Sequence, residues 1–162
     1  MAASGSQRLA GVGCQIRHSG YTNMSTAPTL EAFNQRGVGT LPGYLGIEII
    51  EVGHQSMTAQ LPIKPHLLAP NGYLHAGSVV TLADTAAGYA CIANLPEGAQ
   101  SFTTIELKSN HFSTAREGTI VAVANVVHMG RTTQVWDVKV TDKSNGKTIA
   151  LFRCTQMILY PK

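Results

Sequence analysis

A long apolar segment that carries a single charge limits most strongly what this chain can fold into. Residues 76–93 place apolar side chains on nearly every side of the helix that their spacing predicts, and such a helix must be buried. Asp84 is the only charged residue in the segment. Burying an ionised carboxylate is costly unless the group is paired or hydrogen-bonded. Asp84 is therefore the leading candidate for a functional residue.

A turn rich in Pro, Gly and Asn leads into the helix, and His75 stands nine residues before Asp84. At Ala76 and Gly77 the backbone N–H groups lack helical partners, and the helix dipole adds partial positive charge. A carbonyl oxygen that gains negative charge during acyl transfer suits this position. Asp84 lies about 12 Å further along at 1.5 Å per residue, too far to act on the same carbonyl. Two antiparallel helices at a dimer interface would solve this, so the spacing favours a site shared between subunits.

The composition is typical of one soluble globular domain with few surface charges. The chain has 162 residues, of which 44% are hydrophobic and 13% charged, and we expect a second copy to cover part of its apolar surface. The net charge of +3 comes without a basic run or interleaved aromatic residues, which argues against nucleic acid as a partner. Thr81, Asp84 and Thr85 interrupt the longest apolar run, which argues against a membrane span.

The cysteines and the N-terminus bear on the compartment. Cys14, Cys91 and Cys154 are odd in number and show no CxxC spacing, so we expect neither a disulfide framework nor a metal site, and a reducing, cytoplasmic environment. The first 23 residues are rich in Ser, Gly and Ala and contain no acid. We predict a disordered extension over residues 1–28, or an upstream start site, and a single domain over 29–162. We favour both interpretations over a weak organellar transit peptide.

Hydrophobic periodicity and turn residues predict the elements of this domain. A short helix should run from Thr29 or Leu30 to Gln35 and close at Gly37, and Leu41-Pro42-Gly43 should break the chain. Strands are expected at 45–52 and 55–63 before the buried helix, and at 101–112, 118–128, 132–142 and 147–159 after it. In the strand 101–112, Thr103, Ile105 and Leu107 should share one face. The order predicts a single α+β domain, in which an antiparallel sheet with a three- or four-strand meander wraps around the central helix. Exposed edge strands would invite a second subunit.

His75-Ala76-Gly77 followed by Leu82-Ala83-Asp84 resembles the signature of hotdog-fold thioesterases. That signature is His-Gly-Gly, then Leu-Ala-Asp or Leu-Ala-Glu, with the carboxylate nine residues after the histidine. The similarity is to the phenylacetic-acid-degradation and 4-hydroxybenzoyl-CoA thioesterase types, and it extends over roughly residues 41–159. It implies a hotdog fold and hydrolysis of an acyl-CoA thioester, with aromatic acyl groups favoured. It also implies a homodimer or a dimer of dimers and no metal or redox cofactor, coenzyme A being part of the substrate.

The resemblance also implies roles for individual residues. Asp84 would be the nucleophile or the general base, the N–H of Ala76 would polarise the thioester carbonyl, and His75 would shape the turn or touch the substrate. Thr104 falls where many relatives place a Ser or Thr that helps to hold the water. The sequence Gly130-Arg131-Thr132 falls where relatives contact the pantetheine arm and phosphates of coenzyme A, with Arg131 as a phosphate partner. Arg116 is a weaker candidate for the nucleotide's phosphates.

Two positions depart from the family pattern. Ala76 stands in place of the first glycine, and Ala69 stands six residues before the histidine, where many relatives carry Asn or Gln. Asn71 is the nearby candidate for the substrate-orienting hydrogen bond, although a turn residue would look the same. Two other functions stay open: a hotdog dehydratase or hydratase, and a hotdog domain that binds acyl-CoA without turning it over.

Overall fold

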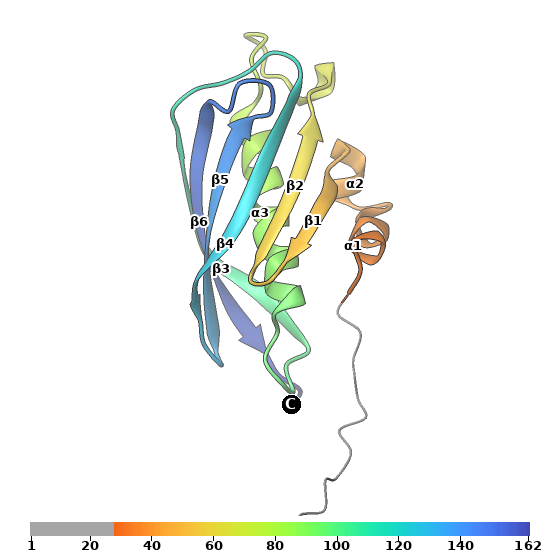
Figure 1. Ribbon diagram of the computed structural model, residues 1–162, viewed down its shortest axis with the longest axis vertical. Coiled ribbons are helices and arrows are strands. Elements are labelled where there is room, and N and C mark those ends of the chain that lie inside the picture. The colour runs from red at the N-terminus through yellow and green to blue at the C-terminus, as the bar shows by residue number, and fades with distance from the viewer. Residues whose placement is uncertain (1–27) are drawn as a thin grey trace, which may run out of the picture.

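The computed structural model describes residues 28–162, so the extension predicted over 1–28 lies outside the described residues apart from Pro28. The described chain forms a curved sheet around one long helix (Figure 1). Its elements are α1 (Leu30–Gly37), α2 (Leu41–Leu45), β1 (Glu48–Gly53), β2 (Ser56–Pro62), the 3-10 helix η1 (Pro65–Leu67), α3 (Ala76–Ala93), β3 (Ser101–His111), β4 (Thr119–Met129), β5 (Thr133–Asp142) and β6 (Thr148–Leu159).

The predicted first helix is confirmed, but the predicted chain break after it is wrong. Thr29 caps α1 by accepting a hydrogen bond from the N–H of Ala32 at 3.3 Å, and the helix ends at Gly37. Leu41-Pro42-Gly43 begins α2 instead of breaking the chain. Proline is tolerated there because the first turn of a helix leaves its N–H groups unpaired in any case. Gly46 ends α2 in a left-handed conformation, with φ of 83°, so β1 starts at Glu48 and not at residue 45.

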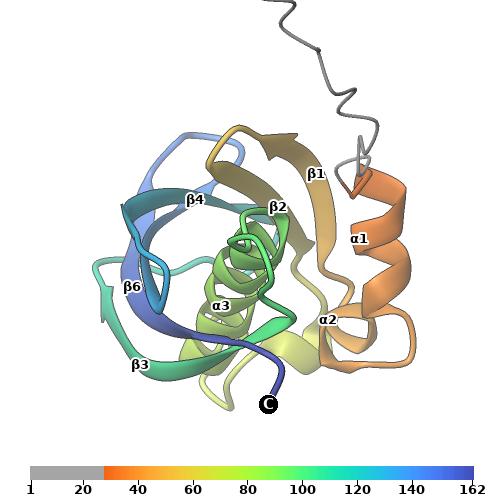
Figure 2. The same ribbon diagram turned by 90° about the horizontal axis from the view of Figure 1, so that it is seen from below.

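The sheet has six antiparallel strands in the order β1-β2-β4-β5-β6-β3. Viewed from below, it curls around α3, while α1 and α2 stand beside β1 (Figure 2). This confirms the predicted α+β domain with a sheet wrapped around a central helix. The meander contains only β4, β5 and β6, because β3 does not pair with its successor β4. The 112–118 connection carries the chain back across the end of the sheet, and β3 pairs with β6 at the far edge.

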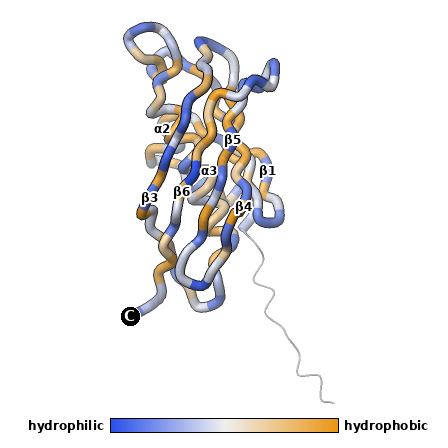
Figure 3. The backbone as a smooth tube through the Cα atoms, turned by 90° about the vertical axis from the view of Figure 1, so that its left-hand side faces the viewer, coloured by the Kyte–Doolittle hydropathy of each residue, from blue (hydrophilic) through white to orange (hydrophobic). Residues whose placement is uncertain are grey.

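Alternating strands present one apolar face to α3, and hydrophilic and hydrophobic residues are interleaved along them (Figure 3). In β5 the alternating residues Trp136, Val138 and Val140 are buried. The prediction for β3 is wrong, because a bulge between Thr104 and Glu106 shifts the alternation. Leu107, paired with the buried Cys154, therefore lies on the helix side of the sheet, where it is still 44% exposed at the β3 edge.

Thr103 points the other way. It pairs with Met157, whose side chain is on the open face of the sheet. The shared face predicted for Thr103, Ile105 and Leu107 thus does not exist, and the inward residues of β3 are those opposite the buried residues of β6.

The central helix occupies the boundaries predicted for it, residues 76–93. Ten of its eighteen residues are buried against the sheet and α1; Phe33 of α1 stacks on Tyr89 with ring centroids 5.4 Å apart. By length and hydropathy α3 is also sufficient to cross a membrane, but its burial identifies it as the core helix. The burial is not complete: a stripe through Gly77, Thr81 and Asp84 stays open to solvent within one chain.

Candidate active site

The start of α3 is built around His75, which caps the helix. Its backbone is extended, with φ −67° and ψ 135°, and its Nδ1 accepts a hydrogen bond from the N–H of Gly77 at 2.8 Å. Its own N–H donates to the carbonyl oxygen of Leu67 at 3.0 Å. Because Nδ1 is an acceptor, the proton of the neutral ring sits on Nε2. A Cβ at position 77 would lie 2.9 Å from that Nδ1, so the cap requires glycine there.

These contacts leave one N–H free at the helix start. Gly77 donates to His75, and the N–H groups of Ser78 and Val79 donate to the His75 carbonyl. The N–H of Ala76 has no acceptor among residues 28–162, and Ala76 is exposed. An unpaired N–H at the positive end of a helix dipole is suited to an oxygen that is gaining negative charge.

Asp84 lies two turns further along on the open stripe of α3. Its side chain is half-buried, and its Oδ1 is buried without a hydrogen-bond partner among the described residues. In residues 28–162 the one salt bridge joins Arg153 and Asp137, so no cation of the described chain pairs with Asp84. Burial raises the pKa of the Asp84 carboxyl above its ordinary value, because desolvation disfavours the charged form. A carboxylate held in this way is primed to take up a proton.

Thr104 lies at the same level of the helix as Asp84. Phe102 of β3 packs over Gly88, where a Cβ would be 3.0 Å from the Phe102 ring. From that contact, Thr104 is two residues further along β3, about 7 Å. Asp84 is four residues back along the antiparallel α3, about 6 Å. The helix α3 also packs against β6. Burial, and secondly the charge of Asp84, raises the pKa of the Cys154 thiol.

Sequence reasoning missed one residue of this cluster, Gln156. The Thr104 hydroxyl donates to Gln156 Oε1 at 2.8 Å, and Gln156 Nε2 donates to Cys154 Sγ at 3.2 Å. The signal was readable in β6, where an inward set of apolar residues (Ala150, Phe152, Cys154 and Ile158) is interrupted by one amide. Because burying an amide costs free energy unless it is hydrogen-bonded, a lone buried glutamine among apolar residues indicates a specific hydrogen-bonding partner.

Asn71 and Arg116 lie beside the helix start. Asn71 Oδ1 accepts a hydrogen bond from the N–H of Tyr73 at 3.2 Å, which gives Asn71 a turn-forming contact. The Arg116 guanidinium stands 4.1 Å from the centre of the Tyr73 ring. The N–H of Leu74 donates to the Ala115 carbonyl at 2.8 Å, so the β3–β4 connection is tied to the turn before α3.

The turn of residues 130–132 lies at the other end of the helix. It joins β4 to β5, and Gln134, just after it, donates to the carbonyl of Asn94, which caps the C-terminus of α3. The Tyr160 hydroxyl donates to the Arg131 carbonyl at 2.7 Å and orders the turn. Within one chain, therefore, Arg131 and the free N–H of Ala76 are at opposite ends of α3.

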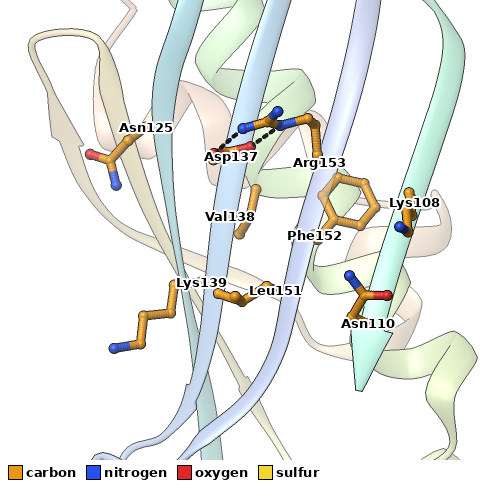
Figure 4. A pocket seen from close by; sticks show the side chains of 9 residues that line it. All are labelled: Lys108, Asn110, Asn125, Asp137, Val138, Lys139, Leu151, Phe152 and Arg153. Carbon is orange, nitrogen blue, oxygen red and sulfur yellow. Dashed lines mark hydrogen bonds and ion pairs between the residues drawn. The ribbon is translucent and has the colours of Figure 1, made fainter. Parts of the chain in front are cut away.

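A separate hollow of about 360 Å³ lies on the outer face of the sheet (Figure 4). It is lined by Lys108, Asn110, Asn125, Asp137, Val138, Lys139, Leu151, Phe152 and Arg153. Its central feature is the exposed pair of Asp137 and Arg153, joined at 2.5 and 2.6 Å. None of the predicted site residues lines it. Within residues 28–162, no three His, Cys, Asp or Glu side chains come close enough to hold a metal ion.

Comparison with known proteins agrees with this geometry. Residues 71–149 match the family model described as thioesterase superfamily. The chain is 35% identical to the 1,4-dihydroxy-2-naphthoyl-CoA hydrolase of Escherichia coli (strain K12), over 81% of this chain and 95% of that protein. Among solved structures, a mutant of thioesterase PA1618 from Pseudomonas aeruginosa superposes with a TM-score of 0.79 and 30% identity, covering 83% of this chain and 96% of that one. The Escherichia coli PaaI protein from the phenylacetic acid degradation operon gives 0.66 and 27%, covering 73% and 83%.

Proposed function

The chain belongs to the thioesterase superfamily and is an enzyme that hydrolyses acyl-CoA thioesters on a hotdog fold, and on that premise we propose that Asp84 and the N–H of Ala76 perform the reaction. One observation carries this assignment. The only carboxylate of the core helix has a buried oxygen without a partner among the described residues, on the helix stripe that the fold leaves open. The free N–H of Ala76, at the exposed start of the same helix, supplies the complementary charge.

Two routes use these groups, and both consume one water. As a general base, Asp84 takes a proton from water while the water oxygen bonds to the thioester carbon. The carbonyl oxygen becomes an oxyanion that accepts a hydrogen bond from Ala76, and its collapse breaks the C–S bond. The proton on Asp84 then passes to the sulfur of coenzyme A. As a nucleophile, Asp84 forms an acyl anhydride with loss of the thiolate, and water cleaves the anhydride.

The active site is proposed to be shared by two chains of a homodimer, alone or within a dimer of dimers. Asp84 and Ala76 are eight residues apart on one helix, about 12 Å. Antiparallel packing of two α3 helices would bring Asp84 of one chain to the helix start of the other. Two features support such pairing: the open stripe of α3, and the unpaired edge of β3 with Ile105 at 55% and Leu107 at 44% exposure.

In the same proposal the substrate spans both ends of the helix pair. Antiparallel packing would also bring the turn of residues 130–132 of one chain toward the helix start of the other. Arg131 would bind a phosphate of coenzyme A there, and Arg116, beside the helix start, remains a second candidate. We propose an aromatic acyl group, which is supported by the naphthoyl-CoA named for the Escherichia coli relative. Neither a metal nor a redox cofactor has a part in this reaction, and we place it in the cytoplasm.

The first test follows thiol release from a panel of aromatic and aliphatic acyl-CoAs. We expect the wild type to hydrolyse at least one, and Asp84→Asn to lose about 10²-fold or more, the scale of a catalytic acid–base group. A folded Asp84→Asn protein with wild-type activity would remove Asp84 from the mechanism. No thiol release from any acyl-CoA, together with thermal stabilisation by CoA, would favour a binding module instead.

The second test addresses the shared site. Ala76→Pro removes the N–H, and each single variant should be inactive as a homodimer. The Ala76→Pro and Asp84→Asn chains are then mixed in equal amounts and allowed to exchange subunits. Half of the dimers should be heterodimers, each with one intact site of two, so the mixture should recover about a quarter of wild-type activity. No recovery in verified heterodimers would contradict a site built from two chains.

A further inference from the structure

We propose that Gln156 is a positioning residue that holds the Thr104 hydroxyl as a hydrogen-bond acceptor for the hydrolytic water, an inference that rests on the proposed role of Asp84. The contacts that carry it are local and short. The Thr104 hydroxyl donates to Gln156 Oε1 at 2.8 Å, and Gln156 Nε2 donates to Cys154 Sγ at 3.2 Å. Gln156 and Cys154 are both 0% exposed, so water does not compete for the hydrogen bond between them.

The direction of the Thr104 hydrogen bond decides what its oxygen can offer. A hydroxyl has one proton and two lone pairs. With its proton committed to Gln156 Oε1, Thr104 can only accept from a water molecule. Such a water would donate one hydrogen bond to Thr104 and the other to the Asp84 carboxylate. The lone pairs of its oxygen would then remain free to attack the carbonyl carbon of the thioester. This arrangement belongs to the general-base route, in which the Asp84 carboxylate is free when the water attacks. In the nucleophilic route Asp84 is acylated at that step, and Thr104 alone would hold the water.

The position of the pair agrees with this role. The Phe102–Gly88 contact brings Thr104 to the level of Asp84, and α3 contacts both β3 and β6, the two strands that carry Thr104 and Gln156. Thr104 is only partly buried, whereas Gln156 beneath it is fully buried. Gln156 therefore has no access to the substrate, and its effect must be transmitted through Thr104.

The chain offers a matched control in Gln134. It is also 0% exposed, and it is paired with Gln156 in the register of β5 and β6. Its bonds are different: Oε1 accepts from Trp136 Nε1 at 3.0 Å, and Nε2 donates to the Asn94 carbonyl at 2.8 Å. Replacing either glutamine removes one buried and one partly buried hydrogen bond from neighbouring positions in the core, but only Gln156 contacts the Thr104 hydroxyl.

The experiment compares Gln156→Met, Gln134→Met, Thr104→Val and the double variant of 156 and 104 by kcat, KM and thermal midpoint. We expect Gln156→Met and Thr104→Val each to lower kcat about tenfold, the equivalent of one hydrogen bond, with KM unchanged. The double variant should fall no further than either single one, because both act through one group. Gln134→Met should lower the thermal midpoint and leave kcat unchanged. Thr104→Ser, which keeps the hydroxyl, should restore kcat.

Three results would overturn the inference while leaving the thioesterase assignment intact. They are wild-type kcat in Gln156→Met, equal losses of kcat in Gln156→Met and Gln134→Met, and additive losses in the double variant. If Gln156→Met does not fold, Thr104→Val decides, and wild-type kcat in that variant excludes the role. An inactive wild type would contradict the proposed function itself, and the inference with it.

Discussion

Replacing Ala76 by proline removes the backbone N–H from the proposed reaction centre, and we expect little loss of folding stability. Ala76 is the first residue of α3, and its N–H has no acceptor among the described residues. Proline is favoured at the first helical position, where φ near −65° fits and the N–H is unpaired anyway. The preceding residue must be extended, and His75 already has φ −67° and ψ 135°. We expect the free energy of unfolding to change by less than about 0.5 kcal/mol, as for an ordinary exposed substitution.

The expected effect on catalysis is much larger. Loss of one oxyanion donor costs about 10²–10³ in kcat, or about 3–4 kcal/mol of transition-state stabilisation. Ala76→Pro should therefore lose kcat by this factor at an unchanged thermal midpoint. The separation of the two quantities is the informative result, since a misfolded helix start would lower both.

Two measurements make the test decisive. Ala76→Gly keeps the N–H and should retain kcat, because the donor and not the methyl group is at issue. Inhibition by free CoA should be equal in the proline variant and the wild type, which shows that the ring has not closed the site. Wild-type kcat in Ala76→Pro, or an equal loss in Ala76→Gly, would refute the assignment of this N–H as the oxyanion donor.

Three further predictions follow from the same contacts. Asp84→Asn should raise the thermal midpoint at pH 7. Burial raises the pKa of the Asp84 carboxyl in the folded state above its ordinary value of 3.8, so the wild type loses stability as the pH rises above 3.8 and the carboxyl ionises. Below that pH the carboxyl is protonated in both the folded and the unfolded state, so the difference in midpoint between variant and wild type should vanish. Gly88→Ala should lower stability by about 1 kcal/mol in denaturant unfolding, because crowding Phe102 costs about 1–3 kcal/mol and alanine recovers about 1 kcal/mol in a helix; equal or higher stability would show that Phe102 yields freely. Arg131→Ala should raise KM for acyl-CoA by about tenfold or more, as for one charge-assisted hydrogen bond, but not for an N-acetylcysteamine thioester that lacks phosphates; an equal rise for both would exclude phosphate binding.

The features that could be predicted from the sequence depend on residues close together in the chain. The boundaries of α3 follow from its apolar periodicity and from the turn that precedes it, and the structure confirms them. The inward set of β5 is likewise a property of consecutive residues, since strand side chains alternate by geometry alone. The family signature around His75 and Asp84 is contained within ten residues, which is why the motif and the reaction class were accessible from the chain.

Two errors have local causes that periodicity does not reveal. Leu41-Pro42-Gly43 forms a short helix because proline and glycine occupy positions where a helix accepts them, although both usually signal a break. The bulge in β3 puts Leu107 on the helix side of the sheet because the strand must follow β6, and one inserted residue reverses the face of every residue beyond it.

Only the tertiary structure decided which distant residues meet. The place of β3 beside β6, at the edge opposite β1, depends on a pairing between segments some fifty residues apart, and several strand orders satisfy the same alternating pattern. That pairing places Gln156 under Thr104, a contact that spans 52 positions in the chain. The curvature of the sheet decides how far Asp84 is buried: it covers one side of α3 and leaves the stripe with the carboxylate open. The sequence shows which chemical groups are available. Which of them are buried and which come into contact depends on the folded sheet and helix, because the surfaces involved meet only after the chain has folded.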